Sequence, residues 1–246
     1  MREKAQSLYD EYPELAIVEK KDLDNKNREV HSFVIRTNKL HTFQLEAVKN
    51  YYDHYVIRYK DEIMDFKKIF NNDKPVIIEI GFGTGESTHR IAKDRSQFNY
   101  IAIEVFLNGF TKLLSVIGNE NIENVRLMRF DAVAVLNDMI ADGSVHGFHI
   151  FFPDPWPKKK HHKRRLIQTP FTNLLSKKLK TGGYIYCVTD WQEYAQQMLE
   201  VLTETNDMTN SYNGYSDSRE WRPTTKYERR GVKLDYNINE VWFEKE

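Results

Sequence analysis

Acidic side chains recur in this sequence at the ends of apolar, β-branched runs. Parallel strands present their carboxyl ends at one edge of a sheet, and ligands bind outside that edge. Acids placed at successive strand ends would therefore face one ligand, and carboxylates favour a ligand that is cationic or rich in hydroxyl groups. The acids are Glu79, Glu104, Asp131, Asp154 and Asp190.

The first acid lies beside a glycine-rich turn, in which Gly81, Gly83 and Gly85 alternate with other residues. Glycine lets the backbone approach a ligand closely and adopt positive φ. The spacing is not the G-x-G-x-x-G of dinucleotide sites, and the acids Glu79 and Glu86 disfavour a pyrophosphate at the following helix. S-Adenosylmethionine, which carries a sulfonium and an ammonium group, is the better match.

Two further acids suit the nucleoside of this cofactor. Glu104 lies about twenty residues on, where it would accept hydrogen bonds from ribose hydroxyls, and Asp131 would accept one from the adenine amino group. Taken singly, the glycines are typical of a tight turn and both acids of helix N-caps. Their joint occurrence at successive strand ends favours the cofactor.

The stretch "HIFFPDPWPKKKHHKRR" (149–165) joins an apolar run to three prolines and a dense basic segment. Prolines flank Asp154 and fix the backbone around it, so we expect a rigidly held carboxylate where a methyl acceptor would meet the sulfonium. Trp156 offers a flat face for a base, and the six Lys/Arg residues in 158–165 suit phosphates. Singly, these features also fit a rigid loop and a solvated face.

Five strands that alternate with helices predict a doubly wound, mostly parallel sheet from residue 75 onward. Residues 1–74 are more polar and irregular, and we expect a partly flexible N-terminal extension with a short strand or docked segment at 31–36 and a helix near 43–70. The expected strands of the domain at 75–246 are 76–80, 100–105, 125–130, 146–152 and 182–189.

Composition is that of a soluble globular protein, with 40% hydrophobic and 29% charged residues among 246. The 36 basic and 36 acidic side chains cancel, but the basic charge is concentrated at 158–165, which fits RNA binding at one face. A single cysteine, Cys187, excludes an internal disulfide and a cysteine-cluster metal site, and indicates a cytoplasmic setting. We expect no metal, no signal peptide and no membrane span.

The chain resembles the bacterial tRNA (guanine-N7)-methyltransferases. The resemblance is carried by motifs between Glu79 and Gly231, about two-thirds of the chain, and looser similarity at Arg36 and Gln44 leaves the role of the extension open. The block at 151–166 is specific to the family, whereas the glycine turn is shared with many methyltransferases. The motifs are "EIGFGTGES", "IAIEV", "DA" at 131–132, "FFPDPWPKKKHHKRRL", "VTDW" and "TKYERRG".

The resemblance implies a Rossmann-like class I S-adenosylmethionine-dependent methyltransferase with a seven-stranded sheet, acting on N7 of guanine 46 in the tRNA variable loop. S-Adenosylhomocysteine would be the product, and the protein would be a monomer or homodimer. Asp154 is implied as the catalytic residue. The cofactor set is Glu79, Gly81, Gly83, Gly85, Glu104, Asp131 and Ala132; the substrate set is Lys158, Asp190, Thr225, Lys226, Tyr227 and Glu228; the RNA set is Lys160, His161, His162, Lys163, Arg164 and Arg165.

Guanine N7 has a free lone pair, so attack requires no general base, and acids would stabilise the growing positive charge on the ring. Asp154, Asp190 and Glu228 are the candidates, with Asp154 expected nearest the reaction. Two alternatives stay open: a methyltransferase for another RNA base, a protein or a small molecule, and a non-enzymatic RNA-binding protein. The Asp-Pro-Pro-aromatic loops of amino-methylating DNA enzymes occupy the same position as Asp154.

Overall fold

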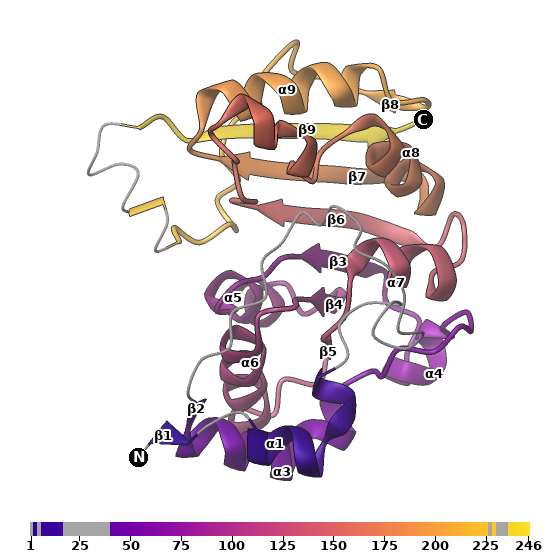
Figure 1. Ribbon diagram of the computed structural model, residues 1–246. Coiled ribbons are helices and arrows are strands. Elements are labelled where there is room, and N and C mark those ends of the chain that lie inside the picture. Colours follow the sequence, from indigo (N-terminus) through magenta and orange to yellow (C-terminus); the bar gives the residue numbers. More distant parts are fainter. Residues whose placement is uncertain (1, 4–5, 17–39, 226–227, 230–235) are drawn as a thin grey trace.

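The computed structural model describes residues 2–3, 6–16, 40–225, 228–229 and 236–246. A seven-stranded sheet in the order β5-β4-β3-β6-β7-β9-β8 forms its centre (Figure 1). β3 to β7 are mutually parallel, and β9 runs antiparallel to both β7 and β8. The strands are β3 (Val76–Ile80), β4 (Asn99–Ile103), β5 (Val125–Met128), β6 (Val145–Phe151), β7 (Leu179–Thr189), β8 (Met208–Thr209) and β9 (Asn239–Lys245).

All five expected strands are present, and the expected α/β class with a doubly wound sheet is confirmed. β3 and β4 are buried along their whole length, because helices cover both of their faces. The chain leaves β5 to return beside β3 as β6, so the direction of winding reverses between β3 and β6. This reversal places the carboxyl ends of β3 and β6 side by side, where ligands of such sheets bind.

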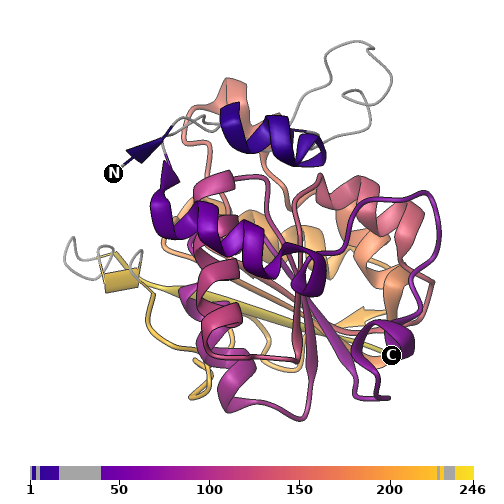
Figure 2. The same cartoon turned by 90° about the horizontal axis from the view of Figure 1, so that it is seen from below.

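Helices pack on the two faces of the sheet (Figure 2). On one face α7 (Ala132–Met139), α8 (Thr169–Lys178) and α9 (Gln192–Thr203) cover Ile78 and Ile101. On the other face α3 (Thr42–Tyr55), α5 (Glu86–Asp94) and α6 (Leu107–Asn119) cover Ile77 and Ala102. Alternate residues of one strand thus enter two separate cores, as the period of two in a strand requires.

Residues that precede the sheet pack against it. α3 and α4 (Phe66–Phe70) both lie within or close to the region 43–70 where a helix was expected, with an irregular segment between them. The other elements here are β1 (Arg2–Glu3), α1 (Gln6–Glu11), η1 (Pro13–Ala16) and β2 (Leu40–His41). The expected strand at 31–36 lies outside the described residues. Within the part that is described, no helix has the length and hydropathy to cross a membrane.

Candidate active site

The glycine turn lies between β3 and α5 and has the backbone that its sequence predicts. Gly81, Gly83 and Gly85 all have positive φ, of 78°, 58° and 74°. A Cβ atom at Gly81 or Gly83 would meet no atom within 4 Å, whereas one at Gly85 would lie 2.7 Å from the Leu113 side chain. The first two glycines therefore leave open space beside the turn, and the third allows close packing on α6.

Glu79 lies on β3, two residues before Gly81. Its side chain is buried, and its Oε2 atom has no hydrogen-bond partner. Burial raises the pKa of the Glu79 carboxyl to about 7; the Thr88 hydroxyl opposes this shift and the charge of Glu104 adds to it. The residue opposite Glu79 on β6 is His149, whose pKa burial lowers to about 3, so that the imidazole is neutral. Glu79 is therefore a buried acid, and the neutral His149 beside it supplies no positive charge.

Glu104 follows β4 and holds the glycine turn. Its Oε2 accepts a hydrogen bond from the Gly83 N–H at 2.8 Å, and its Oε1 accepts from Val105 and Phe106 N–H at 2.8 and 3.0 Å. Burial raises the pKa of this carboxyl, against these three donors and the charge of Arg129. Glu104 thus fixes the turn relative to the start of α6, a role that the sequence did not indicate.

Asp131 forms the N-cap of α7, where its Oδ1 accepts a hydrogen bond from the Ala134 N–H at 2.9 Å. The N-cap alternative is thus realised for this residue, and Ala132 is the first residue of the helix. Asp131 therefore lies at the expected strand end, after β5, which neighbours β4.

Asp154 lies in the segment that leaves β6, and its side chain is exposed. Two non-glycine residues around it have positive φ, Phe152 at 51° and Trp156 at 44°. The Phe152 N–H donates to the Val188 carbonyl on β7 at 2.7 Å, which holds the segment against the sheet. A backbone strained at two places so close together is typical of functional sites.

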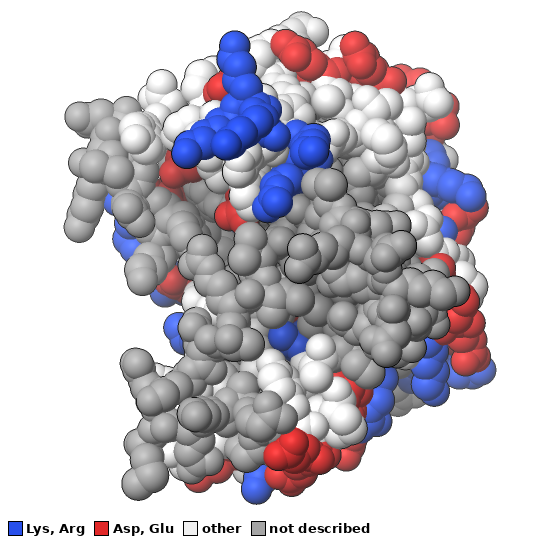
Figure 3. Space-filling model, in the orientation of Figure 1, with Lys and Arg blue, Asp and Glu red and all other residues white. Residues whose placement is uncertain are grey.

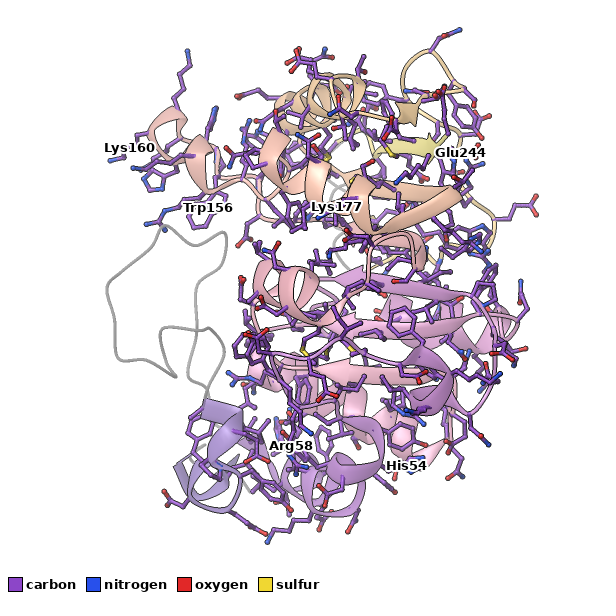
Figure 4. The ribbon with its side chains drawn as sticks, turned by 90° about the vertical axis from the view of Figure 1, so that its right-hand side faces the viewer. His54, Arg58, Trp156, Lys160, Lys177 and Glu244 are labelled. Atoms are coloured by element: carbon purple, nitrogen blue, oxygen red, sulfur yellow. The ribbon has the colours of Figure 1, made fainter. Side chains whose placement is uncertain are left out.

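The basic segment forms a 3-10 helix, η2 (Lys159–Arg164), directly after this loop. Lys and Arg side chains gather over it in the upper part of Figure 3, and in Figure 4 Lys160 points away from the body of the protein. Arg164 lies over the Trp156 ring at 4.9 Å, and His161 lies 5.8 Å from that ring. One face of Trp156 is therefore already covered by a cation. The exposed cations are Lys158, Lys159, Lys160 and Lys163.

Arg165 differs from the rest of this segment, because its side chain is 1% exposed. Its Nε donates to the Pro155 carbonyl at 2.9 Å and its Nη1 to Gln197 Oε1 at 2.6 Å, and the guanidinium lies over the Tyr194 ring. His162, expected beside it in the RNA set, pairs at 3.4 Å with Glu193. Arg165 therefore anchors the Asp154 loop to α9, and its burial leaves little surface for the expected contact with RNA.

The remaining residues of the expected substrate set follow β7 along the chain. Asp190 follows the strand and is half-buried. Thr225 and Glu228 form a reciprocal cap, with the Glu228 N–H donating to Thr225 Oγ1 at 3.1 Å and the Thr225 N–H to Glu228 Oε2 at 3.2 Å. Arg222 binds the two oxygens of Glu228 at 2.7 and 3.0 Å. Lys226 and Tyr227 lie outside the described residues.

Comparisons with known proteins identify the family of this chain. The model of a family described as "putative methyltransferase" matches residues 73–241. A tRNA (guanine-N(7)-)-methyltransferase of Neisseria meningitidis serogroup C is 44% identical over 218 residues, covering 89% of this chain and 92% of the relative. The enzyme of that name from Chromobacterium violaceum is 46% identical over 216 residues, or 88% and 96% of the two chains. The chain belongs to the tRNA (guanine-N7)-methyltransferase family.

A solved structure supports the same fold at much lower identity. The 16S rRNA methyltransferase KamB matches with a TM-score of 0.52 and 12% identity, over 77% of this chain and 97% of that one. At such identity the match shows the fold alone. The sequence, the order of the strands and the comparison thus all indicate the Rossmann-like fold of class I methyltransferases.

This family member also has a buried network that sequence reasoning missed. Arg222 binds Glu240 Oε1 at 2.5 Å, and its Nε donates to the Tyr186 hydroxyl at 3.0 Å. Tyr186 in turn donates to Glu240. The available signal was Glu240 itself, a charged residue beside Val241 in the strand "NEVWFEK" (239–245), because a buried charge needs a partner.

A separate hollow of about 240 Å³ lies away from these residues, at the opposite edge of the sheet. It is lined by polar side chains at the end of α8 and near β8, and it contains none of the expected site residues. Among the described residues, no group of three or more His, Cys, Asp or Glu side chains gathers where it could hold a metal. The lining residues are Asn173, Ser176, Lys177, Asn206, Asp207 and Lys245.

Proposed function

We propose that this chain transfers the methyl group of S-adenosylmethionine to N7 of a guanine in the variable loop of tRNA, position 46. The observation that carries the proposal is the adjacency of two strand ends. The open glycine turn follows β3, and the Asp154 loop follows β6, the neighbouring strand at the reversal of the sheet. The cofactor and the acceptor would meet there.

The residues at the glycine turn fit the cofactor. Glu79 offers a buried carboxylate oxygen without a partner, which suits the ammonium group, and Gly81 and Gly83 leave room for backbone contact. Glu104 and Asp131 follow the neighbouring strands β4 and β5, where they would accept hydrogen bonds from the ribose and the adenine. The bound cofactor supplies an electrophilic methyl group on a positively charged sulfur.

The acceptor side would orient the base and favour its positive charge. N7 attacks with its own lone pair, so the protein need not remove a proton first. Asp154 and Asp190 are the acids we assign to the guanine, since Glu228 is bound through both oxygens by Arg222. A fixed carboxylate stabilises charge that appears in the transition state without reorganising during the reaction.

The basic segment would bind the phosphates of the tRNA next to this pocket. Lys158, Lys159, Lys160 and Lys163 are exposed there. The one cysteine of the chain, Cys187, is buried and free, which suits a reducing compartment, and we place the reaction in the cytoplasm.

The test is methyl transfer in vitro to an unmodified tRNA transcript, with the product nucleoside identified by mass spectrometry. We expect 7-methylguanosine, and we expect none from a matched transcript in which adenine replaces the variable-loop guanine. A methyl group on another base, or on neither RNA, would overturn the assignment.

A further inference from the structure

The N-terminal segment contacts the cofactor side of the domain through one buried amide. Gln44, in the first turn of α3, is 3% exposed. Its Nε2 donates to the Asn108 carbonyl at 2.9 Å and to Thr111 Oγ1 at 2.8 Å, both on α6. Its Oε1 accepts from the His41 N–H at 2.9 Å, which caps α3 itself. One side chain thus joins the start of α3 to the first turns of α6.

These first turns of α6 form a wall of the cofactor site. A Cβ atom at Gly109 would lie 1.7 Å from the Gly83 carbonyl oxygen, so helix and glycine turn touch along their backbones. The N–H groups of Val105 and Phe106, just before α6, bind Glu104, which binds the Gly83 N–H. A shift of this end of α6 would therefore move both the turn and the Glu104 carboxylate.

The other end of α6 is held by α3 independently. The Tyr51 hydroxyl donates to Asn119 Oδ1 at 2.8 Å, and a Cβ atom at Gly118 would lie 2.3 Å from the Tyr51 ring. Residues of α3 such as Val48 and Tyr52 share a core with Phe110 and Leu114 of α6. α3 is thus packed along the whole of α6, with one polar contact near the cofactor site and one far from it.

We propose that Gln44 is a positioning residue for the cofactor site, and that the N-terminal segment serves the reaction by fixing the start of α6 against the glycine turn. The proposal rests on the proposed function, in that S-adenosylmethionine is taken to bind at this turn. Small displacements in such a site are costly, because each interaction with the ligand depends on geometry.

The test compares Gln44→Met with Tyr51→Phe in the full chain. Gln44→Met removes two hydrogen bonds between α3 and α6 and Tyr51→Phe removes one, and both variants keep the side chain's bulk. We expect Gln44→Met to raise the dissociation constant for S-adenosylmethionine about tenfold, measured by calorimetry well below the melting temperature. Tyr51→Phe should leave it within about twofold. In steady state, KM for the cofactor should rise in Gln44→Met while KM for tRNA stays unchanged.

Gln44→Met also removes the cap of α3, and Thr111→Val separates the effect of the cap from that of the bond to α6. Thr111→Val keeps the cap and the shape and removes one acceptor of the amide, so we expect about a threefold weaker cofactor affinity, with no further weakening on adding it to Gln44→Met. If Gln44→Met and Thr111→Val both lower the melting temperature but bind the cofactor with wild-type affinity, the inference is overturned. Wild-type protein that binds no S-adenosylmethionine would overturn the proposed function, and the inference with it.

Discussion

At the scale of single residues, Glu79 is a carboxyl group whose charge costs free energy in the free protein. Burial raises its pKa from 4.5 to about 7, so the folded state binds a proton that the unfolded state has released. The stability that the neutral carboxyl contributes is fully present below the pKa of the unfolded state, 4.5. It is lost as the pH rises through the pKa of the folded state, about 7. A bound cation would reverse this balance, because it favours the ionised form.

This predicts how Glu79→Gln changes stability with pH. The amide stays neutral, so the variant escapes the cost that wild-type protein meets on ionisation. We compare the free energy of unfolding of the variant with that of wild-type protein, by urea unfolding without cofactor. The difference in favour of the variant should be about 2 kcal/mol larger at about pH 8.5 than at about pH 5.5. Cofactor affinity should increase through pH 7 in wild-type protein and stay flat in the variant. An equal stability difference at both pH values would mean that Glu79 does not titrate in this range.

The carboxylate of Asp154 has the opposite surroundings, since it is exposed on a loop held by strained backbone and by Arg165. We expect Asp154→Asn to lower the rate of methyl transfer by roughly 10²–10³-fold, because the charge that stabilises a cationic guanine is removed while the size is kept. Single-turnover transfer at saturating cofactor and tRNA measures this. A rate within a few-fold of wild type would move the role to Asp190.

At the scale of elements, sequence reasoning succeeded where a pattern is local and failed where an interaction is distant. The β-branched runs and the glycine turn predict β3 and its ligand edge, because strand, turn and the start of the helix follow one another directly along the chain. Arg165 ends a run of cations and looks like Arg164 beside it. Its burial depends on Glu193, Tyr194 and Gln197 of α9, about thirty residues later, and no local signal reports that packing.

The exposed lysines and the buried Arg165 of the basic segment should differ in their effect on the salt dependence of tRNA binding. Replacing Lys159, Lys160 and Lys163 by Ala should weaken tRNA binding and reduce the slope of log affinity against log salt by ~0.7–0.9 for each phosphate that is no longer neutralised. Arg165→Lys, the matched change of a buried cation, should keep that slope. Affinity measured over a salt series decides: a triple variant with the wild-type slope would show that these lysines do not bind RNA.

At the scale of the whole molecule, the acceptor side depends on chain segments that meet only in the complete fold. Arg222 joins Tyr186 on β7, Glu240 on β9 and Glu228 beyond the central strands, and the side chains of Arg222 and Glu240 are 3% and 4% exposed. Arg229 continues from the same segment to Glu86 at the start of α5, at 3.4 Å, in an exposed pair. The last strand thus positions a segment that reaches the start of α5, next to the glycine turn.

Removing one member of a buried ion-pair network leaves the others charged and unpaired, which costs far more than the removal of a surface pair. Arg222→Met leaves Glu228 and Glu240 without their shared cation, so we expect the free energy of unfolding to fall by about 3–5 kcal/mol. Arg229→Met removes the exposed pair with Glu86 and an exposed hydrogen bond to the Thr224 carbonyl, and it should cost about 0–1 kcal/mol. Urea unfolding of both variants at neutral pH gives the comparison. Equal destabilisation in the two variants would show that the Arg222 network does not hold the acceptor segment to the sheet.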